Sequence, residues 1–231
     1  MLAAVTHSDA TVEAAVGAGG QQGDLVRIGN QNAPKTEGGK SLIVYVGAEF
    51  CPYCAAERWS LIMALSRFGN FSNLQTTTSS STDAYPNTNT FTFHGASYSS
   101  QYLSFQSAEL SDRNEQPLES PSAQVSNIFQ TFGQPPYAAS SQGFPFLYIG
   151  GQYSLYQTSY SPSLLQGMSW DQIASQLSQP NSDVAKAVVG NANFITAAIC
   201  ATTGNQPSQT CSTPTIQGLE TQLKGQQPVS G

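Results

Sequence analysis

The hydrophobic pattern of this chain is organised around one segment, Ser41 to Gly69. It opens with an unbroken apolar run rich in β-branched residues, Leu42 to Val46, and such a run is typical of a strand buried on both faces of a sheet. Apolar residues then recur at helical spacing from Ala55 to Phe68, which predicts a helix of about four turns. Gly69 is expected to end this helix. The segment therefore predicts a central strand that turns sharply into a helix.

The rest of the chain alternates between shorter periodic segments and polar connections. Strands are predicted at 25–28, 74–78, 91–94 and 102–105, in the apolar segment after Pro145, and at 153–156. Helices are predicted at 10–16, 121–132, 169–177, 182–201 and 216–224. The strands at 91–94 and 102–105 are expected to turn at Gly95 and to pair as a hairpin within an insertion.

Two cysteines lie at the predicted corner between strand and helix, in the sequence Cys51-Pro52-Tyr53-Cys54. Pro52 suits the first turn of a helix, because its φ is already helical and its missing N–H would have been unpaired there. A thiol at a helix N-terminus has a lowered pKa, since the helix dipole and the free N–H groups stabilise the thiolate. Cys54 lies one turn further on, within reach of a disulfide. We therefore predict a redox-active dithiol in which Cys51 attacks and Cys54 resolves.

Two other interpretations of the cysteine pair stay open at this point. A zinc site would need four ligands, and the sequence contains no second Cys-x-x-Cys, so no metal is expected. The pair could instead form an inert structural disulfide within a non-catalytic extracellular binding module.

Two segments carry a resemblance to a known fold. The loop from Ala48 to Cys54 resembles the active-site loop of the thioredoxin fold, and its Pro-Tyr dipeptide is similar to that of glutaredoxins. The segment from Gly143 to Gly151 resembles the one that carries the cis proline of that fold, with an apolar strand and a Gly-Gly hairpin turn after it. Over most of its length the chain is similar to an extracytoplasmic thioredoxin-like family of prokaryotes, known as a domain of unknown function. The shared features are GAEFCPYCAAERW, ALSRFG and a late Ala-x-x-Cys helix with a further cysteine beyond it.

The resemblance implies one α/β thioredoxin-like domain over residues 25–231, with a central mixed sheet flanked by helices. Residues 1–24 would form an N-terminal extension, about 80–120 an insertion before the cis proline, and about 169–224 a C-terminal helical segment. The implied activity is thiol–disulfide exchange with protein substrates and an unidentified redox partner, without a cofactor.

The resemblance also implies roles for residues around the dithiol. Pro145 would keep metals from the site and shape the substrate groove, and the Phe144 backbone would pair with an extended substrate strand. Pro52 and Tyr53 would support the site within the loop itself, and Glu49 matches an acidic position common in thioredoxins. Glu49 could transfer protons or could be a solvated side chain beside the loop.

Some positions depart from the family pattern. Tyr45 stands where thioredoxins carry a buried acid that accepts the proton of the resolving thiol. Glutaredoxins have Thr and Asp near the positions of Phe144 and Gln152, so binding of glutathione is not expected. Arg58 follows Cys54 by about a turn. It could stabilise the Cys51 thiolate, but a charge on a solvated helix face is the expected interpretation.

Cys200 and Cys211 flank a turn outside any Cys-x-x-Cys sequence, which predicts a structural disulfide, with two free thiols as the alternative. A structural disulfide indicates an oxidising compartment. Only 10% of the residues are charged, against the usual quarter or so, and a surface of neutral polar groups is common in secreted proteins. An extracytoplasmic location is therefore expected.

Charge and hydropathy narrow the range of partners. The net charge of −6 and an isoelectric point near 4.7 favour neither nucleic acid nor anionic membranes as partners. No apolar run is expected to reach membrane-spanning length, and the first residues lack the basic and apolar regions of a signal peptide. We expect an export signal or a membrane tether to precede Met1 in the full-length protein.

Overall fold

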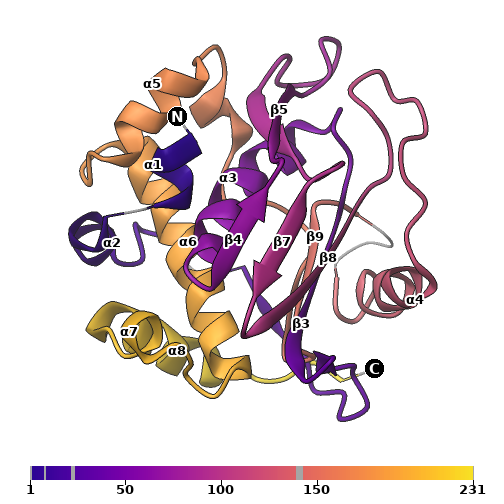
Figure 1. Cartoon of the computed structure of the whole chain (residues 1–231), viewed down its shortest axis with the longest axis vertical. Helices are drawn as coiled ribbons and strands as arrows, with labels where there is room; N and C mark the ends of the chain where they lie inside the picture. The colour runs from indigo at the N-terminus through magenta and orange to yellow at the C-terminus, as the bar shows by residue number, and fades with distance from the viewer. Residues whose placement is uncertain (1, 8, 22–23, 139–142, 231) are drawn as a thin grey trace.

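The computed structural model of the chain describes residues 2–7, 9–21, 24–138 and 143–230 (Figure 1). Its centre is a six-stranded mixed sheet in which β3 lies between β8 and β9. The strands are β1 (Val26–Arg27), β2 (Thr36–Glu37), β3 (Lys40–Gly47), β8 (Leu103–Glu109), β9 (Phe146–Ile149) and β10 (Tyr153–Leu155). Strand β3 runs parallel to β8 and antiparallel to β9, β10 continues the sheet to β1, and β2 pairs with the first residues of β3. The predicted buried strand is therefore confirmed as the central one.

Helices cover both faces of this sheet. Side chains alternate along β3: Ile43 and Tyr45 pack toward α3 (Pro52–Ser66) and α6 (Asp183–Thr202), while Leu42, Val44 and Val46 pack toward α4 (Ala123–Phe132). Figure 1 shows α4 on one side of the sheet and α6 on the other. Because both faces are covered, the strand needs an unbroken apolar sequence, and the predicted mixed sheet flanked by helices is confirmed.

The order of the core elements places the end of both parallel strands at one edge. The chain runs β3, α3, β8, α4, β9, β10 and α6. Gly47 and Glu109, the last residues of β3 and β8, are partners in the register. Helix α3 starts at this same edge, so the cysteine loop lies beside the end of β8.

The remaining helices pack against α6 or α3. They are α1 (Leu2–Thr6), α2 (Ala10–Val16), α5 (Trp170–Leu177), α7 (Ser208–Cys211) and α8 (Pro214–Lys224), with a 3-10 turn at Pro162–Leu165. Helices α2, α5, α7 and α8 pack around α6, and α1 packs against α3 and α5. One helix among the described residues, α6, is long and apolar enough to cross a membrane, and 89% of that stretch is buried within the fold. The expectation that no apolar run reaches that length was wrong, because a central core helix needs the same composition.

The N-terminal extension is packed against the domain. The Asn193 Nδ2 group of α6 donates to Glu13 O at 3.1 Å and to Gly17 O at 2.8 Å, which ties the end of α2 to α6. The Glu13 carboxylate also pairs with the Arg67 guanidinium at 3.2 Å, at the end of α3. The extension therefore belongs to the same packed unit as the core.

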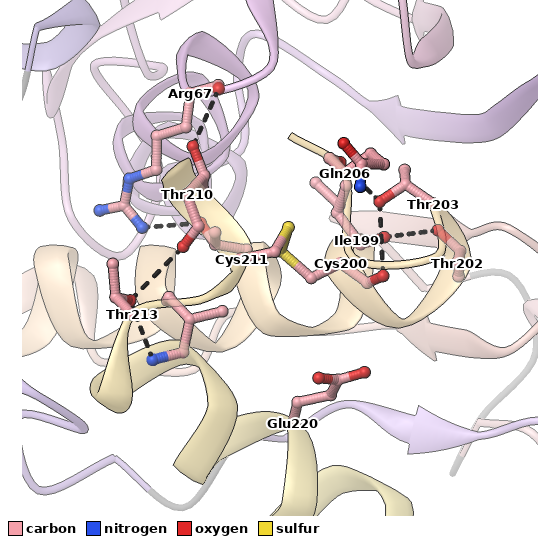
Figure 2. Close-up of a disulfide and its surroundings, with 12 residues drawn as sticks. Arg67, Ile199, Cys200, Thr202, Thr203, Gln206, Thr210, Cys211, Thr213 and Glu220 are labelled. Carbon is pink, nitrogen blue, oxygen red and sulfur yellow. Dashed lines mark hydrogen bonds between the residues drawn. A yellow bond between two sulfur atoms is a disulfide. The ribbon is translucent and has the colours of Figure 1, made fainter. Parts of the chain in front are cut away.

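Cys200 and Cys211 form the predicted structural disulfide, which joins the end of α6 to α7 (Figure 2). Both cysteines are fully buried. Thr210 Oγ1 donates to Arg67 O at 3.4 Å, so the segment held by the disulfide also contacts the end of α3. The disulfide is consistent with an oxidising environment.

The segment between α3 and β8 forms two small sheets, not the predicted hairpin. Strand β4 (Gly69–Ser72) pairs with β7 (Ser97–Ser100), and β5 (Gln75–Thr78) pairs with β6 (Asn89–Thr92). The predicted pairing of 91–94 with 102–105 is wrong, since β8 is a strand of the central sheet. The strands between residues 69 and 100 thus lie outside the central sheet, and Gly69 begins β4 instead of ending α3. An alternating pattern shows which face of a strand is buried, but it does not name the partner strand.

Candidate functional site

Cys51 is the N-cap residue of α3. Its backbone is extended, with φ −74° and ψ 120°, Pro52 occupies the first turn, and the Cys54 N–H donates to Cys51 Sγ at 3.3 Å. Both cysteines are free thiols in the structure. Cys51 keeps 6% of its surface exposed and Cys54 none. The two sulfur atoms are thus unequal, and the first one satisfies a helix N–H that would otherwise lack a partner.

The electrostatic environment separates the two thiols further. The hydrogen bond from the Cys54 side chain is the main cause that lowers the pKa of Cys51, and the Arg58 charge lowers it as well, against the opposing effect of burial. Burial raises the pKa of Cys54 well above its usual value, and the neighbouring Cys51 sulfur raises it too. This arrangement favours a thiolate on Cys51 and a protonated thiol on Cys54.

Aromatic side chains surround the cysteine loop. The rings of Phe50 and Phe144 meet edge to face with centroids 5.9 Å apart, and those of Tyr53 and Tyr85 do so at 6.0 Å. Tyr53 is 42% exposed, which is unusual for a large apolar residue in the described part of the chain. We call these four residues the aromatic rim. The rim brings the segments around residues 50, 85 and 144 to one place.

The proline loop has the predicted conformation. The Phe144–Pro145 peptide bond is cis, and Pro145 is buried just before β9. Through the ring contact between Phe144 and Phe50, this loop lies against the residue that precedes Cys51.

The β5–β6 hairpin holds the cysteine loop from its other side. The Ser80 N–H donates to Phe50 O at 2.8 Å, and Thr90 Oγ1 donates to Ala55 O at 2.7 Å. Thr77 Oγ1 approaches Glu49 Oε2 at 3.5 Å, and Glu49 is only 9% exposed. The view of Glu49 as a solvated side chain beside the loop is therefore wrong, because the hairpin covers it.

A buried ion pair lies under the cysteine loop. The Arg58 guanidinium donates from Nε to Glu109 Oε1 at 2.8 Å and from Nη2 to Glu109 Oε2 at 2.6 Å, and both side chains are fully buried. Nη2 also donates to Ala48 O at 2.8 Å. The expected solvated position of Arg58 is wrong. Spacing could have revealed this, since Arg58 lies four residues after Cys54 and four before Ile62, both of which are buried.

Residues 24–201 match the sequence model of a protein family, DUF929, which is described as a domain of unknown function. The chain belongs to this family. The match includes the cysteine loop, the β5–β6 hairpin, the proline loop and Cys200 of this DUF929 member, and it ends before Cys211. No curated protein and no solved structure matches the chain.

Sequence reasoning also missed a buried acid in the DUF929 chain. Glu57 is fully buried, and Asn191 Nδ2 of α6 donates to both of its carboxyl oxygens at 3.0 Å. Burial raises the pKa of Glu57 to about 8. Among the described residues, no group of three or more His, Cys, Asp or Glu side chains is arranged to hold a metal ion.

Proposed function

We propose that the chain is a thiol–disulfide oxidoreductase in which Cys51 and Cys54 exchange electrons with protein thiols. The observation that carries this proposal is the inequality of the two cysteines. Cys51 caps α3, keeps some exposure and has a lowered pKa, whereas Cys54 is fully buried and has a raised pKa. A nucleophilic thiol needs access and a stabilised thiolate, and a resolving thiol needs neither until the mixed disulfide has formed.

The topology supports a thioredoxin-like fold for this function. The sheet order β10–β9–β3–β8, with β3 parallel to β8 and antiparallel to β9, gives the central mixed sheet that the resemblance implies. The cysteine pair follows the central strand and the cis Phe144–Pro145 bond precedes β9, as in that fold. Fold alone does not imply function, so the proposal rests on the cysteines and takes the fold as support.

The reaction proceeds in two exchanges. The Cys51 thiolate attacks one sulfur of a substrate disulfide, the substrate S–S bond breaks, and the released substrate thiolate takes a proton from solvent. Cys54 then loses its proton and attacks the Cys51 sulfur, which releases the second substrate thiol. The substrate disulfide has gained two electrons, and Cys51 and Cys54 are joined. Run in reverse, the same steps oxidise a dithiol, and a redox partner restores the starting state in either direction.

The aromatic rim favours protein substrates. Phe50 and Tyr53 belong to the cysteine loop, and their rings meet those of Phe144 and Tyr85, which come from two other segments. Aromatic rings add contact area at little cost in side-chain entropy, which suits the capture of an extended segment around a cysteine. With the Cys200–Cys211 disulfide, the proposal places the protein outside the cytoplasm in an oxidising compartment.

One observation favours the alternative of a non-catalytic binding module. Cys51 exposes only 6% of its surface, less than an open groove would give. So little exposure leaves the sulfur nearly closed to a substrate disulfide, whereas a binding module would use the Cys51–Cys54 bond only as a structural link.

The test is the reduction potential of the Cys51–Cys54 couple in the full chain. The protein is equilibrated in glutathione or dithiothreitol buffers and alkylated, and peptide mass spectrometry reads this pair separately from Cys200–Cys211. A potential between about −120 and −270 mV supports an oxidoreductase, and its place in that range shows whether the protein oxidises or reduces. A bond that resists reduction below about −300 mV supports the binding module.

A matched pair of variants tests the assignment of the two cysteines. Cys54→Ser should accumulate a mixed disulfide on Cys51 with a protein substrate, because nothing resolves it. Cys51→Ser should form none, since Cys54 is fully buried. Equal trapping by both variants would contradict the proposed roles.

A further inference from the structure

Helix α3 places Arg58 directly under the dithiol. Arg58 follows Cys54 by four residues, so the two side chains share a helix face and Arg58 leans back toward the cysteine. Its Nη2 group donates to Ala48 O, and a hydrogen bond from the Ala48 backbone also lowers the pKa of Cys54. A buried positive charge therefore lies against the short loop that carries both sulfur atoms.

The groups that can carry charge around Arg58 come from three elements. Cys51 and Cys54 belong to the start of α3, Tyr45 to β3 and Glu109 to β8. The Tyr45 ring centroid lies 6.0 Å from the guanidinium carbon, and burial raises the pKa of Tyr45 so far that its phenol stays neutral. The charged groups packed under the sulfur atoms are therefore one cation, Arg58, and one carboxylate, Glu109, while Glu49 lies in the cysteine loop itself, covered by the β5–β6 hairpin.

One nitrogen of the Arg58 guanidinium has no hydrogen-bond partner among the described residues. Glu109 engages Nε and Nη2 of Arg58, while Nη1 is buried without a hydrogen-bond partner among the described residues. The Tyr45 hydroxyl is also buried without a hydrogen-bond partner among the described residues. It fits there only because Gly47 has no side chain, since a Cβ at Gly47 would collide with it. The Nη1 group is thus an unpaired donor in a buried environment. There the positive charge of the guanidinium is screened far less than at a surface.

We propose that the Arg58–Glu109 pair sets the reduction potential of the Cys51–Cys54 couple, an inference that rests on the proposed redox function. Two electrons break the S–S bond, and the product is a thiolate on Cys51 and, with one proton, a thiol on Cys54. Arg58 stabilises the negative sulfur and with it the reduced form, so it makes the couple more oxidising. Glu109 opposes Arg58. The ion pair between α3 and β8 would thus influence the dithiol, while Tyr45 stands at the position where thioredoxins carry a buried acid.

The test compares the equilibrium between this couple and glutathione in the full chain and its variants. Arg58→Met removes the cation. We expect the equilibrium constant with glutathione to shift about tenfold toward the disulfide, which lowers the reduction potential by about 30 mV. Glu109→Gln leaves the cation uncompensated, and we expect a shift of about the same size toward the dithiol. Arg58→Lys keeps the charge and should stay close to wild type. The pH profile of Cys51 alkylation should move to higher pH in Arg58→Met and to lower pH in Glu109→Gln.

Opposite shifts separate this role from a structural one. An ion pair that only holds the fold would lower stability in both variants, without moving the potential in opposite directions. Glu57→Gln is the matched control, because it removes an equally buried carboxyl group from the neighbouring residue of α3 and should leave the potential unchanged. If Arg58→Met does not fold, the shift of Glu109→Gln toward the dithiol and the wild-type behaviour of Arg58→Lys still decide the question.

The outcomes also separate this inference from the proposed function. A wild-type couple that exchanges with glutathione, combined with shifts of the same sign or no shift in the two charge variants, overturns the inference alone. A wild-type couple that does not exchange at all overturns the proposed function and this inference with it.

Discussion

Glu57 makes the stability of this protein depend on pH in a defined way. Its carboxyl group is fully buried between α3 and α6, and burial raises its pKa from 4.5 to about 8 although Asn191 and Thr158 donate hydrogen bonds to it. The folded state therefore binds the Glu57 proton more tightly than the unfolded state. This contribution to the free energy of unfolding is fully present below about pH 4.5 and is lost as the pH rises through about 8.

The size of the effect follows from these two pKa values. Between pH 5 and pH 8, Glu57 alone should reduce the free energy of unfolding by about 3 to 4 kcal/mol, since one pKa unit corresponds to about 1.4 kcal/mol. In Glu57→Gln the amide does not titrate, and it can still accept from Asn191 and donate to Thr158. The variant should therefore gain about 3 to 4 kcal/mol relative to wild type over that range. Denaturant unfolding at unit steps of pH, with both proteins in the same thiol state, measures the difference.

Thr158→Val is a suitable control, because it keeps the Glu57 carboxyl group and removes a donor that favours the ionised form. It should keep the pH dependence of wild type and extend it to slightly higher pH. A difference between Glu57→Gln and wild type that stays constant from pH 5 to pH 8 would refute the reasoning, because it would mean that Glu57 binds its proton equally well in both states.

Two further predictions concern the rim and the second cysteine pair. Replacing both Tyr53 and Tyr85 by Ala should slow exchange with a protein disulfide by about tenfold, the equivalent of about 1.4 kcal/mol of lost aromatic contact, and leave exchange with oxidised glutathione unchanged. Stopped-flow kinetics with both substrates measure this, and equal slowing would show a defect in the dithiol itself. Replacing both Cys200 and Cys211 by Ser should lower the free energy of unfolding by about 3 kcal/mol, because the disulfide closes a loop between residues 11 positions apart. Denaturant unfolding checks this, the alkylation rate of Cys51 should not change, and unaltered stability would contradict the assigned structural role.

Local sequence was enough to predict the strand, the corner and the helix that carry the cysteines. An apolar run such as Leu42 to Val46 can be satisfied only by burial on both faces, and Pro52 marks a helix start for purely local reasons. The same is true of Ser182, which caps α6 by accepting the Ala185 N–H. These features depend on a few neighbouring residues, and the structure reproduces them.

Pairing between distant segments could not be predicted in this way. The strand at 91–94 was expected to pair with 102–105, but its partner is β5, and 103–109 became a core strand beside β3. Both segments alternate, and their aromatic residues even meet, with the rings of Phe93 and Phe105 5.2 Å apart. Alternation is compatible with either arrangement, so the choice depended on packing between segments that are distant in the sequence.

The sequence by itself determined the central strand, the helix that follows it and the presence of two cysteines at a helix N-terminus. Only the tertiary structure decided what surrounds those cysteines. Arg58 and Glu109 are 51 residues apart, and Glu57 and Asn191 are 134 apart. A charged residue in a helix pattern is compatible with solvent or with a buried partner. The partner exists only once β8 and α6 have packed against α3, and burial is what makes each pairing necessary.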